Sequence, residues 1–314
     1  MMKSKEVTIP SAFPLGGTLT IPSDERSSYP AVLIIMGSGK GDRDGNLKKM
    51  TFNIYRDLAE FLSSKGFITL RYDKRGTHKS EGNFLATGLT DLIDDAVAGV
   101  NFLKNHSQVD KEKVLILGHS EGALIAPAVH EKSPVSGLIL LAGAADASKD
   151  MLPKQNELAF AEIKATKGFK GWLFRKLNVV EKSKKQNKAI FKKVTESDKD
   201  VFRIKGVRVN AKWLRETLAY DVRDYLKEVT VPVLAITGEK DVQVPPEDVK
   251  RIAELVNGEA EWHIIPNMNH LFRKYEGQHT MLGLLKEYKT LVNKEMDKDM
   301  LEKMDSWLRK YYLL

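Results

Sequence analysis

The sequence predicts an α/β protein with a mostly parallel, doubly wound sheet and an inserted helical cap. Short apolar runs rich in Val, Ile and Leu recur along the chain, and segments with helical spacing of apolar residues separate them. This alternation stops at about residue 147 and resumes after residue 227. We therefore expect a core formed by residues 1–146 and 228–314, with a helical cap inserted at residues 147–227.

Length and composition exclude several classes of protein. The 314 residues, 42% of them hydrophobic, suffice for one large α/β domain with an insertion. Because the chain has no cysteine, disulfides, thiolate metal sites and cysteine nucleophiles are excluded. The first residues lack the apolar stretch of a signal peptide, and no apolar run approaches the ~20 residues of a membrane span. We expect a cytoplasmic protein without a membrane span.

The positive charge is concentrated in the predicted cap. The net charge is +8, and residues 149–205 alone contain 16 Lys or Arg and 7 Asp or Glu, an excess of +9. The simplest interpretation is a solvated helical face, so that no nucleic acid is expected as a partner. Nucleic acid, anionic membranes and acidic substrates remain the alternatives for a basic segment.

The elements before the predicted cap follow in a regular order. An edge hairpin is expected at Lys5–Pro10 and Thr18–Pro22, with Gly16-Gly17 between its strands. Further strands are expected at Ala31–Met36, Phe67–Tyr72, Val114–Leu117 and Gly137–Ala142, because these apolar runs suit strands that are covered on both faces. Helices are expected at Phe52–Lys65, which Gly66 ends as a C′ glycine, and at Leu89–Asn105.

After the predicted cap the alternation resumes. Strands are expected at Val233–Thr237 and Glu261–Ile265, and helices at Pro246–Val256 and Lys294–Tyr312. In a sheet of parallel strands, functional residues gather just beyond the carboxyl ends of the strands. The residues that follow each strand therefore decide what the chain does.

The segment Gly118-His119-Ser120-Glu121-Gly122 matches the nucleophile elbow of a hydrolase. It lies between a predicted strand and a helical segment that starts at Ala123. The serine must occupy a very tight turn with strained backbone angles, and Gly118 and Gly122 remove the Cβ atoms that would collide there. Ser120 is therefore the candidate nucleophile.

Two further strand ends supply an acid and a base. Asp241 follows the strand at 233–237, and His270 follows the strand at 261–265, giving the chain order Ser, Asp, His. A serine hydroxyl needs a base within hydrogen-bond reach, and a carboxylate fixes the tautomer of the imidazole. Glu239 is the nearest competitor for the acid, whereas Asp248 falls inside the next predicted helix.

An oxyanion hole requires two backbone N–H donors directed at one point. The amide of Glu121, directly after the nucleophile, is the first candidate. The second is the amide of Ser38 in the loop Gly37-Ser38-Gly39, which follows the strand at 31–36. This loop fits neither nucleotide-binding glycine pattern, so a nucleotide site is not expected there.

On these residues the chain resembles the bacterial α/β-hydrolase serine esterases that carry a Gly-Ser-Gly…Asp-Arg-Asp-Gly segment. The resemblance covers residues 30–145 and 229–275 and rests on five motifs together: Gly37-Ser38-Gly39 with Asp42-Arg43-Asp44-Gly45, Arg71–Ser80, Gly118–Gly122, Gly238–Asp241 and Asn269-His270. It implies an α/β-hydrolase fold and hydrolysis of short-chain carboxylic esters as small-molecule substrates, without a cofactor or a metal. Two departures are His78, where relatives usually have glycine, and the basic cap.

Other polar residues near these motifs have structural interpretations. We expect His119 to pack behind the elbow, the Glu121 side chain to complement the positive N-terminus of its helix, and Asp73 and Arg75 to form an ion pair that shapes their loop. The aromatic residues of the cap could line an acyl pocket or pack the cap.

Three rival functions remain open at this stage. Within the fold they are a thioesterase and a peptidase that removes short N-terminal units. From another class, the chain could be a ligand-binding protein that kept the hydrolase fold. The oligomeric state is not encoded in these patterns.

Overall fold

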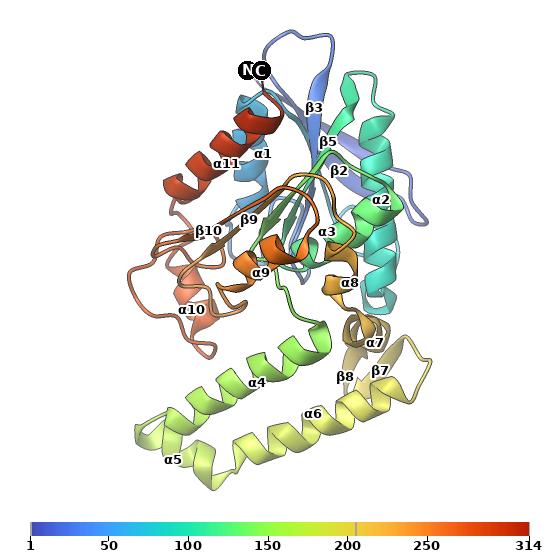
Figure 1. The fold of residues 1–314 in the computed structure, drawn as a ribbon. Coiled ribbons are helices and arrows are strands. Elements are labelled where there is room, and N and C mark those ends of the chain that lie inside the picture. The colour runs from blue at the N-terminus through green and yellow to red at the C-terminus, as the bar shows by residue number, and fades with distance from the viewer. Residues whose placement is uncertain (1, 205, 314) are drawn as a thin grey trace.

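A central eight-stranded sheet organises the chain, as the computed structural model shows for residues 2–204 and 206–313 (Figure 1). Its strands lie in the order β1 (Lys3–Ile9), β2 (Leu15–Ile21), β4 (Ile68–Tyr72), β3 (Tyr29–Ile35), β5 (Val109–His119), β6 (Gly137–Leu141), β9 (Val233–Gly238) and β10 (Ala260–Ile265). Strand β2 runs antiparallel to β1 and β4, and all other neighbouring pairs are parallel. The predicted α/β fold with a mostly parallel sheet is confirmed.

Strand β3 shows why an unbroken apolar sequence forms a central strand. All seven of its residues are buried. Successive side chains of a strand point to opposite faces, so Ala31 and Leu33 contribute to one hydrophobic cluster and Val32 and Ile34 to the other. The sheet therefore separates two cores, and helices must cover both.

Helices cover the two faces as a doubly wound sheet requires. On one face lie α1 (Ile54–Ser64), α10 (Leu284–Lys289) and α11 (Lys298–Tyr311). On the other lie α2 (Leu89–Lys104), α3 (Glu121–Lys132), α8 (Val222–Leu226) and α9 (Asp248–Leu255). Figure 1 shows α1 and α11 on the opposite side of the sheet from α2 and α3.

Most predicted elements of the core are confirmed, with three differences. Gly16-Gly17 lies inside β2 rather than in the turn of the hairpin. Helix α10 and the short 3₁₀ helix at Phe84–Ala86 were not predicted, because both are too short for a periodic pattern to stand out. Gly66 does end α1 with a φ of 92°, a left-handed conformation that suits glycine.

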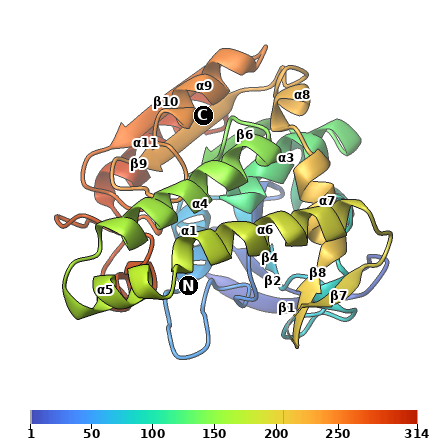
Figure 2. The same ribbon diagram turned by 90° about the horizontal axis from the view of Figure 1, so that it is seen from below.

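The segment between β6 and β9 contains more than helices. It comprises α4 (Ser148–Ala165), α5 (Gly168–Lys176), α6 (Val179–Thr195), the antiparallel hairpin of β7 (Val201–Ile204) and β8 (Val207–Asn210), α7 (Ala211–Ala219) and α8. The expectation of a helical cap missed this hairpin, because strands of four residues are too short for a pattern to stand out. Seen from below, α4 and α6 run side by side and meet at α5 (Figure 2).

The two ends of the inserted segment come together at a neck. The backbone N–H of Ser148, where α4 begins, donates a hydrogen bond of 3.3 Å to the carbonyl oxygen of Tyr220, just after α7. Helix α8 lies beyond this neck and buries Val222 and Leu226 in a sheet-covering core. Within the cap, a small cluster of Val194, Phe202 and Ala211 is buried.

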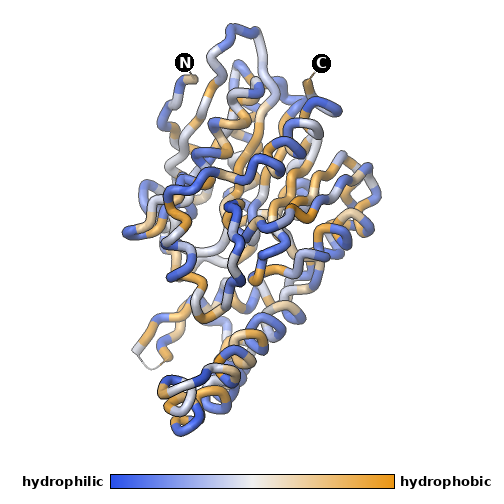
Figure 3. Tube along the Cα trace, turned by 90° about the vertical axis from the view of Figure 1, so that its left-hand side faces the viewer, coloured by the Kyte–Doolittle hydropathy of each residue, from blue (hydrophilic) through white to orange (hydrophobic). Residues whose placement is uncertain are grey.

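The cap arm, which we define as residues 148–195 with helices α4, α5 and α6, carries few buried apolar side chains. Along its tube, hydrophilic and hydrophobic residues alternate to its outer end (Figure 3). None of the helices in the described part of the chain combines the length and the apolar composition that crossing a bilayer requires.

Candidate active site

Ser120 occupies the strained turn that the motif predicts. It lies between the end of β5 at His119 and the start of α3 at Glu121, with φ of 55° and ψ of −114°. Its backbone N–H donates to the carbonyl oxygen of Leu141 at 2.9 Å, which ties the turn to the neighbouring strand β6. A non-glycine residue persists in such a conformation only where the surroundings impose it.

The two flanking glycines are required by close backbone contacts. A Cβ atom on Gly118 would lie 2.4 Å from the carbonyl oxygen of Gly122. A Cβ atom on Gly122 would lie 2.1 Å from the carbonyl oxygen of Ile35 in β3. Since neither backbone oxygen can move without displacing a central strand or helix, only glycine fits at these positions.

Asp241 and His270 meet at the same rim of the sheet. Asp241 follows β9, His270 follows β10, and His270 Nδ1 lies 2.7 Å from Asp241 Oδ2. The other carboxylate oxygen of Asp241 accepts backbone N–H bonds from Gln243 at 2.8 Å and Val244 at 3.1 Å. Both side chains are buried, so the pair is fixed in position.

The competing carboxylates have other partners. Glu239 accepts the backbone N–H of Asn267 at 3.0 Å on the surface. Asp248 accepts the backbone N–H of Ala145 at 3.0 Å and pairs with Arg251. Only Asp241 of these three contacts His270 within the described chain.

Ser120 and His270 line the same cavity, which has a volume of about 230 Å³. Within the described residues, the Ser120 side chain has no hydrogen bond, so the structure does not join Oγ to the imidazole. Catalytic hydrogen bonds are often long without substrate and tighten in the substrate complex. The rest of the lining is mainly apolar and includes Met36, Leu47, Met50, Phe52, Leu271, Leu284 and Leu285.

The loop after β3 stands directly against the nucleophile. A Cβ atom on Gly37 would lie 3.3 Å from Ser120 Cβ. The N–H of Gly37 is already engaged, because it donates to the hydroxyl oxygen of Tyr55 at 2.8 Å. This leaves the amide of Ser38, the next residue, and the amide of Glu121, in the first turn of α3, as candidate donors beside Ser120.

A buried network of hydrogen bonds connects this loop to His270. Tyr55 Oη lies 2.9 Å from His119 Nδ1, and His119 Nε2 lies 3.1 Å from the carbonyl oxygen of His270. Burial, followed by the neighbouring His270, holds the pKa of His119 well below its usual value, so its imidazole is neutral. Nε2 must then carry the single proton, because a carbonyl only accepts, and Tyr55 must donate to Nδ1.

These hydrogen bonds confirm the position predicted for His119 and add a residue that the sequence did not indicate. His119 packs behind the elbow as expected, with its ring 4.8 Å from the His270 ring. Tyr55 was not recognised as a residue of the site. Its hydroxyl acts across 64 positions of sequence, and a tyrosine on the buried face of a predicted helix gives no sign of that contact.

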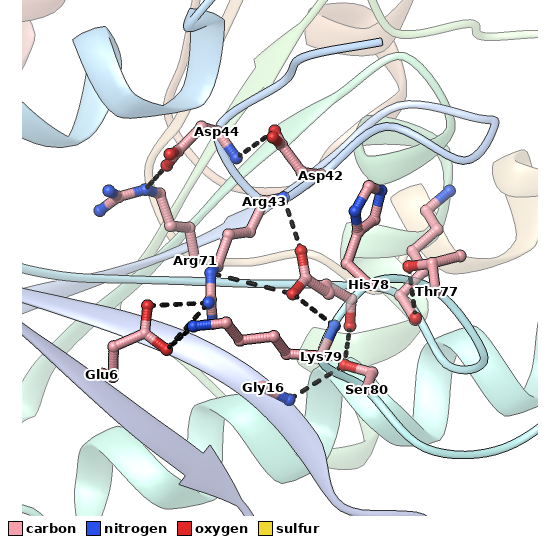
Figure 4. Close-up of polar contacts among 12 residues, drawn as sticks. Glu6, Gly16, Asp42, Arg43, Asp44, Arg71, Thr77, His78, Lys79 and Ser80 are labelled. Atoms are coloured by element: carbon pink, nitrogen blue, oxygen red, sulfur yellow. Dashed lines mark hydrogen bonds and ion pairs between the residues drawn. The ribbon is translucent and has the colours of Figure 1, made fainter. Parts of the chain in front are cut away.

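Ion pairs and side-chain caps hold the segment Asp42–Gly45 in place (Figure 4). Asp44 Oδ1 lies 2.6 Å from Arg71 Nε, and Asp42 Oδ1 accepts the backbone N–H of Asp44 at 3.0 Å. Arg43 donates its backbone N–H to Asp73 Oδ1 at 2.8 Å. Hydrogen bonds and ion pairs therefore connect the loops after β3 and β4 beside the site.

The expected ion pair between Asp73 and Arg75 is wrong. Asp73 accepts from Arg43, whereas Arg75 Nη2 lies 2.7 Å from Asp95 Oδ1 on α2. Asp95 is fully buried, so a guanidinium close to it compensates the cost of burying that carboxylate. Sequence proximity favoured the wrong partner, because the carboxylate that pairs with Arg75 lies 20 positions away in the sequence.

His78 has a left-handed backbone conformation, which favours glycine. Its φ is 44°, and its Nε2 lies 3.0 Å from the carbonyl oxygen of Lys40. Figure 4 shows its side chain in the loop after β4. The imidazole thus contacts the Gly37–Gly45 loop from outside.

The Glu121 side chain connects the core to the cap. It pairs with the buried ammonium of Lys74, and its other oxygen accepts from Trp213 Nε1 on α7 at 2.8 Å. It is thus engaged by two specific side chains, beyond the expected effect on the start of α3. Lys74, Glu121 and Trp213 also line a second cavity of about 200 Å³, and Ser38 borders both cavities.

No metal site is evident in the part of the chain that the structure describes, because no three His, Cys, Asp or Glu side chains gather there. Aromatic residues of the cap differ in their surroundings. Trp213 lines the second cavity, Phe160 and Phe202 are buried, and Phe169 and Trp172 are exposed.

Comparisons with known proteins agree with this arrangement. The family described as "Serine aminopeptidase, S33" matches residues 49–274. Esterase EstD of Thermotoga maritima is 28% identical over 310 residues, which cover 98% of this chain and 68% of the esterase.

Two solved structures share the fold. Est1E from Butyrivibrio proteoclasticus with bound ferulic acid has 21% identity and a TM-score of 0.59, covering 95% of this chain and 99% of Est1E. The esterase Pf2001 of Pyrococcus furiosus has 18% identity and a TM-score of 0.59, covering 99% and 91%. Both similarities support the α/β-hydrolase fold.

Proposed function

We propose that this chain, which belongs to the serine aminopeptidase S33 family of α/β-hydrolases, hydrolyses carboxylic esters through Ser120, His270 and Asp241. The observation that carries the proposal is the buried contact of 2.7 Å between His270 and Asp241 beside the strained turn at Ser120. Each of the three follows the carboxyl end of a different strand, which is where sites form in this class of sheet.

In the proposed mechanism, Ser120 Oγ attacks the ester carbonyl carbon while His270 Nε2 takes the hydroxyl proton. Asp241 accepts the Nδ1–H bond, which fixes the tautomer and stabilises the imidazolium. The tetrahedral intermediate collapses, the C–O bond to the alcohol breaks, and His270 returns the proton to the leaving alkoxide. A water molecule then repeats the sequence on the acyl-enzyme and releases the acid and Ser120.

We assign the oxyanion to the backbone N–H groups of Ser38 and Glu121. The position of Gly37 against Ser120, with its own N–H held by Tyr55, supports Ser38 as the next donor. The start of α3 supports Glu121, since the first amides of a helix are free of intrahelical partners and carry partial positive charge. Each such donor contributes roughly 2.7–4 kcal/mol to the transition state in other hydrolases.

Short acyl chains fit the cavity best. Its volume of about 230 Å³ lies below the roughly 300–1,000 Å³ typical of pockets for drug-sized ligands. Its apolar lining suits an acetyl or butyryl chain. We therefore propose short-chain esters as substrates.

The decisive experiment compares two serine variants on p-nitrophenyl acetate and butyrate. We expect Ser120→Ala to lower kcat/KM by at least about 10⁴-fold with unchanged circular dichroism, because the nucleophile is lost. Ser38→Ala is the matched control: it keeps its backbone N–H, so its loss should stay below about 10-fold. Substantial turnover by Ser120→Ala would contradict the assignment.

The family match also favours a second candidate, cleavage of short N-terminal units from peptides. A panel of matched esters, thioesters and aminoacyl amides separates the three possibilities, and rates on amides above those on esters would identify a peptidase. A ligand-binding protein without activity would fail to react covalently with a fluorophosphonate at Ser120. The cytoplasmic location remains a prediction, which cell fractionation would test.

A further inference from the structure

The outer end of the cap carries exposed aromatic side chains on one face of a helix. Phe169 and Trp172 lie three residues apart on α5, so they share a face, and they are 76% and 48% exposed. Their rings stack with centroids 5.5 Å apart, and Lys176 Nζ lies 4.8 Å from the Trp172 ring. Aromatic side chains held in water cost free energy unless a partner covers them.

Basic side chains surround this aromatic face. We call residues 164–185 the basic tip; they contain eight Lys or Arg and one acidic residue, Glu181. Among the described residues, only Lys184 of these eight has an ion pair, with Glu157. The eight are Lys164, Lys167, Lys170, Arg175, Lys176, Lys182, Lys184 and Lys185. The tip therefore presents uncompensated positive charge around an apolar centre.

The position of the basic tip leaves it free for contact. Figure 1 shows α5 at the outer end of the cap, where α4 and α6 meet, away from the sheet. The opposite face of α5 is engaged within the cap, since Gly171 is buried and a Cβ atom there would lie 1.8 Å from the carbonyl oxygen of Thr166. The aromatic face consequently points outward.

We propose that the basic tip docks this protein on anionic lipid bilayers, with Phe169 and Trp172 at the level of the headgroups. The combination of exposed Phe and Trp with flanking Lys is what interfacial helices use, and each basic residue near an anionic surface strengthens the attraction to it. Lysine stems cover apolar surface while their ammonium groups reach the phosphates. The surplus positive charge and the apolar centre thus complement the two parts of such a surface.

An aliphatic neighbour favours a bilayer over nucleic acid. Leu177, which directly follows α5, is also exposed, and nucleic acid offers it no matching surface. The end of α4 also contacts the rim of the catalytic cavity: Glu162 accepts the backbone N–H groups of Met281 and Leu282 at 2.8 and 2.9 Å. Exposed Leu285 follows shortly after and lines that cavity. These two hydrogen bonds join the end of α4 to the segment that precedes Leu284 and Leu285 of the cavity lining.

Vesicle co-sedimentation of the full chain tests the proposal. We expect binding to vesicles of equal parts phosphatidylcholine and phosphatidylglycerol at about 50 mM salt, no binding to pure phosphatidylcholine, and loss of binding at about 500 mM salt. Lys167→Glu with Lys170→Glu and Lys176→Glu should weaken binding by more than about 100-fold. Lys3→Glu with Lys5→Glu and Lys111→Glu changes the net charge equally on the core and should change binding by less than about 3-fold.

The aromatic contribution requires its own variant. Phe169→Ser with Trp172→Ser should weaken binding by about 10-fold or more. A second experiment adds phosphatidylcholine with brominated acyl chains to the anionic vesicles. These lipids should quench the tryptophan emission of the parent protein more than that of Trp172→Phe. Rates on p-nitrophenyl acetate in solution should be unchanged in all these variants, which confirms their folding.

Four outcomes would overturn the proposal. They are absence of binding to the anionic vesicles at low salt, equal losses in the tip and core charge variants, undiminished binding by the double serine variant, and tighter binding to duplex DNA than to the vesicles in a gel-shift competition.

Discussion

The catalytic rim and the cap arm of this molecule are held together in opposite ways. At the rim, each functional group has several partners: Asp241 accepts two backbone N–H groups besides His270, and His119 bonds to both Tyr55 and His270. In the arm, the ion pairs are exposed and single, such as Lys184 with Glu157. The difference teaches that fixed geometry comes from shared, buried partners, whereas an exposed arm tolerates change.

The largest effect should come from the acid at the rim. We expect Asp241→Asn to lower kcat by about 10⁴-fold, as the equivalent change does in a serine protease, because the amide donates where the carboxylate accepts and favours the wrong tautomer of His270. Steady-state kinetics on p-nitrophenyl butyrate would measure this loss. Glu239→Gln is the matched control, and a comparable loss there would reassign the acid.

The buried link between the oxyanion loop and the elbow should give the next largest effect. Tyr55→Phe removes a hydroxyl that bonds both the Gly37 N–H and His119 Nδ1, leaving two buried polar atoms without partners. We expect a stability loss of about 1–3 kcal/mol in urea unfolding and a drop in kcat. Tyr311, whose hydroxyl donates to the exposed Glu259, serves as control when it is changed to Phe.

The buried His119 at the rim should make the stability of the protein depend on pH. Folding lowers the pKa of His119. Below about pH 6.5, the His119 imidazole therefore binds a proton in the unfolded chain but stays neutral in the folded chain. The stabilisation is therefore complete above that pH and is lost as the pH falls, by up to about 1.4 kcal/mol per pH unit. Urea unfolding of wild type and His119→Gln at pH 7 and pH 5 measures it. An identical pH slope in both would contradict the neutral, buried state of His119.

Trp213 lies where rim and cap meet, and its effect should be intermediate. Trp213→Phe keeps the ring but removes the N–H donor to Glu121 Oε1, whose other oxygen retains Lys74. We expect stability to fall by about 1 kcal/mol and kcat by a few-fold, because the Glu121 backbone is less firmly held. Unchanged kcat with reduced stability would limit this contact to a structural role.

The smallest effect is expected in the cap arm. Lys184→Met breaks the ion pair with Glu157, which is largely exposed, so unfolding free energy should change by less than about 0.5 kcal/mol. Esterase rates should stay the same. A loss comparable to that of Tyr55→Phe would show that the arm is as tightly coupled as the rim.

Local sequence patterns predicted which residues belong to the candidate site better than they predicted which side chains contact one another. Ser120, Asp241 and His270 stood out because each follows a predicted strand, and parallel strands bring their carboxyl ends to one edge. The requirement for glycine at positions 118 and 122 was also predictable, because a turn that tight leaves no room for a Cβ atom.

The contacts that were missed join residues far apart in sequence. Tyr55 reaches His119, and Trp213 reaches Glu121 across 92 positions, with no periodicity that indicates either partner. Arg75 was expected to pair with its neighbour Asp73, whereas it pairs with the fully buried Asp95 on α2. The hairpin at β7 and β8 was missed because four-residue strands carry too little pattern.

The neck at which Ser148 bonds to Tyr220 makes the cap exchangeable in principle. Two chain ends already within a hydrogen bond of each other could be joined by a short linker, leaving α8 to complete the crossover between β6 and β9. Recombination or engineering could therefore graft a different lid onto this scaffold and change its selectivity, provided that the new lid again supplies a donor to the Glu121 side chain, as Trp213 does here.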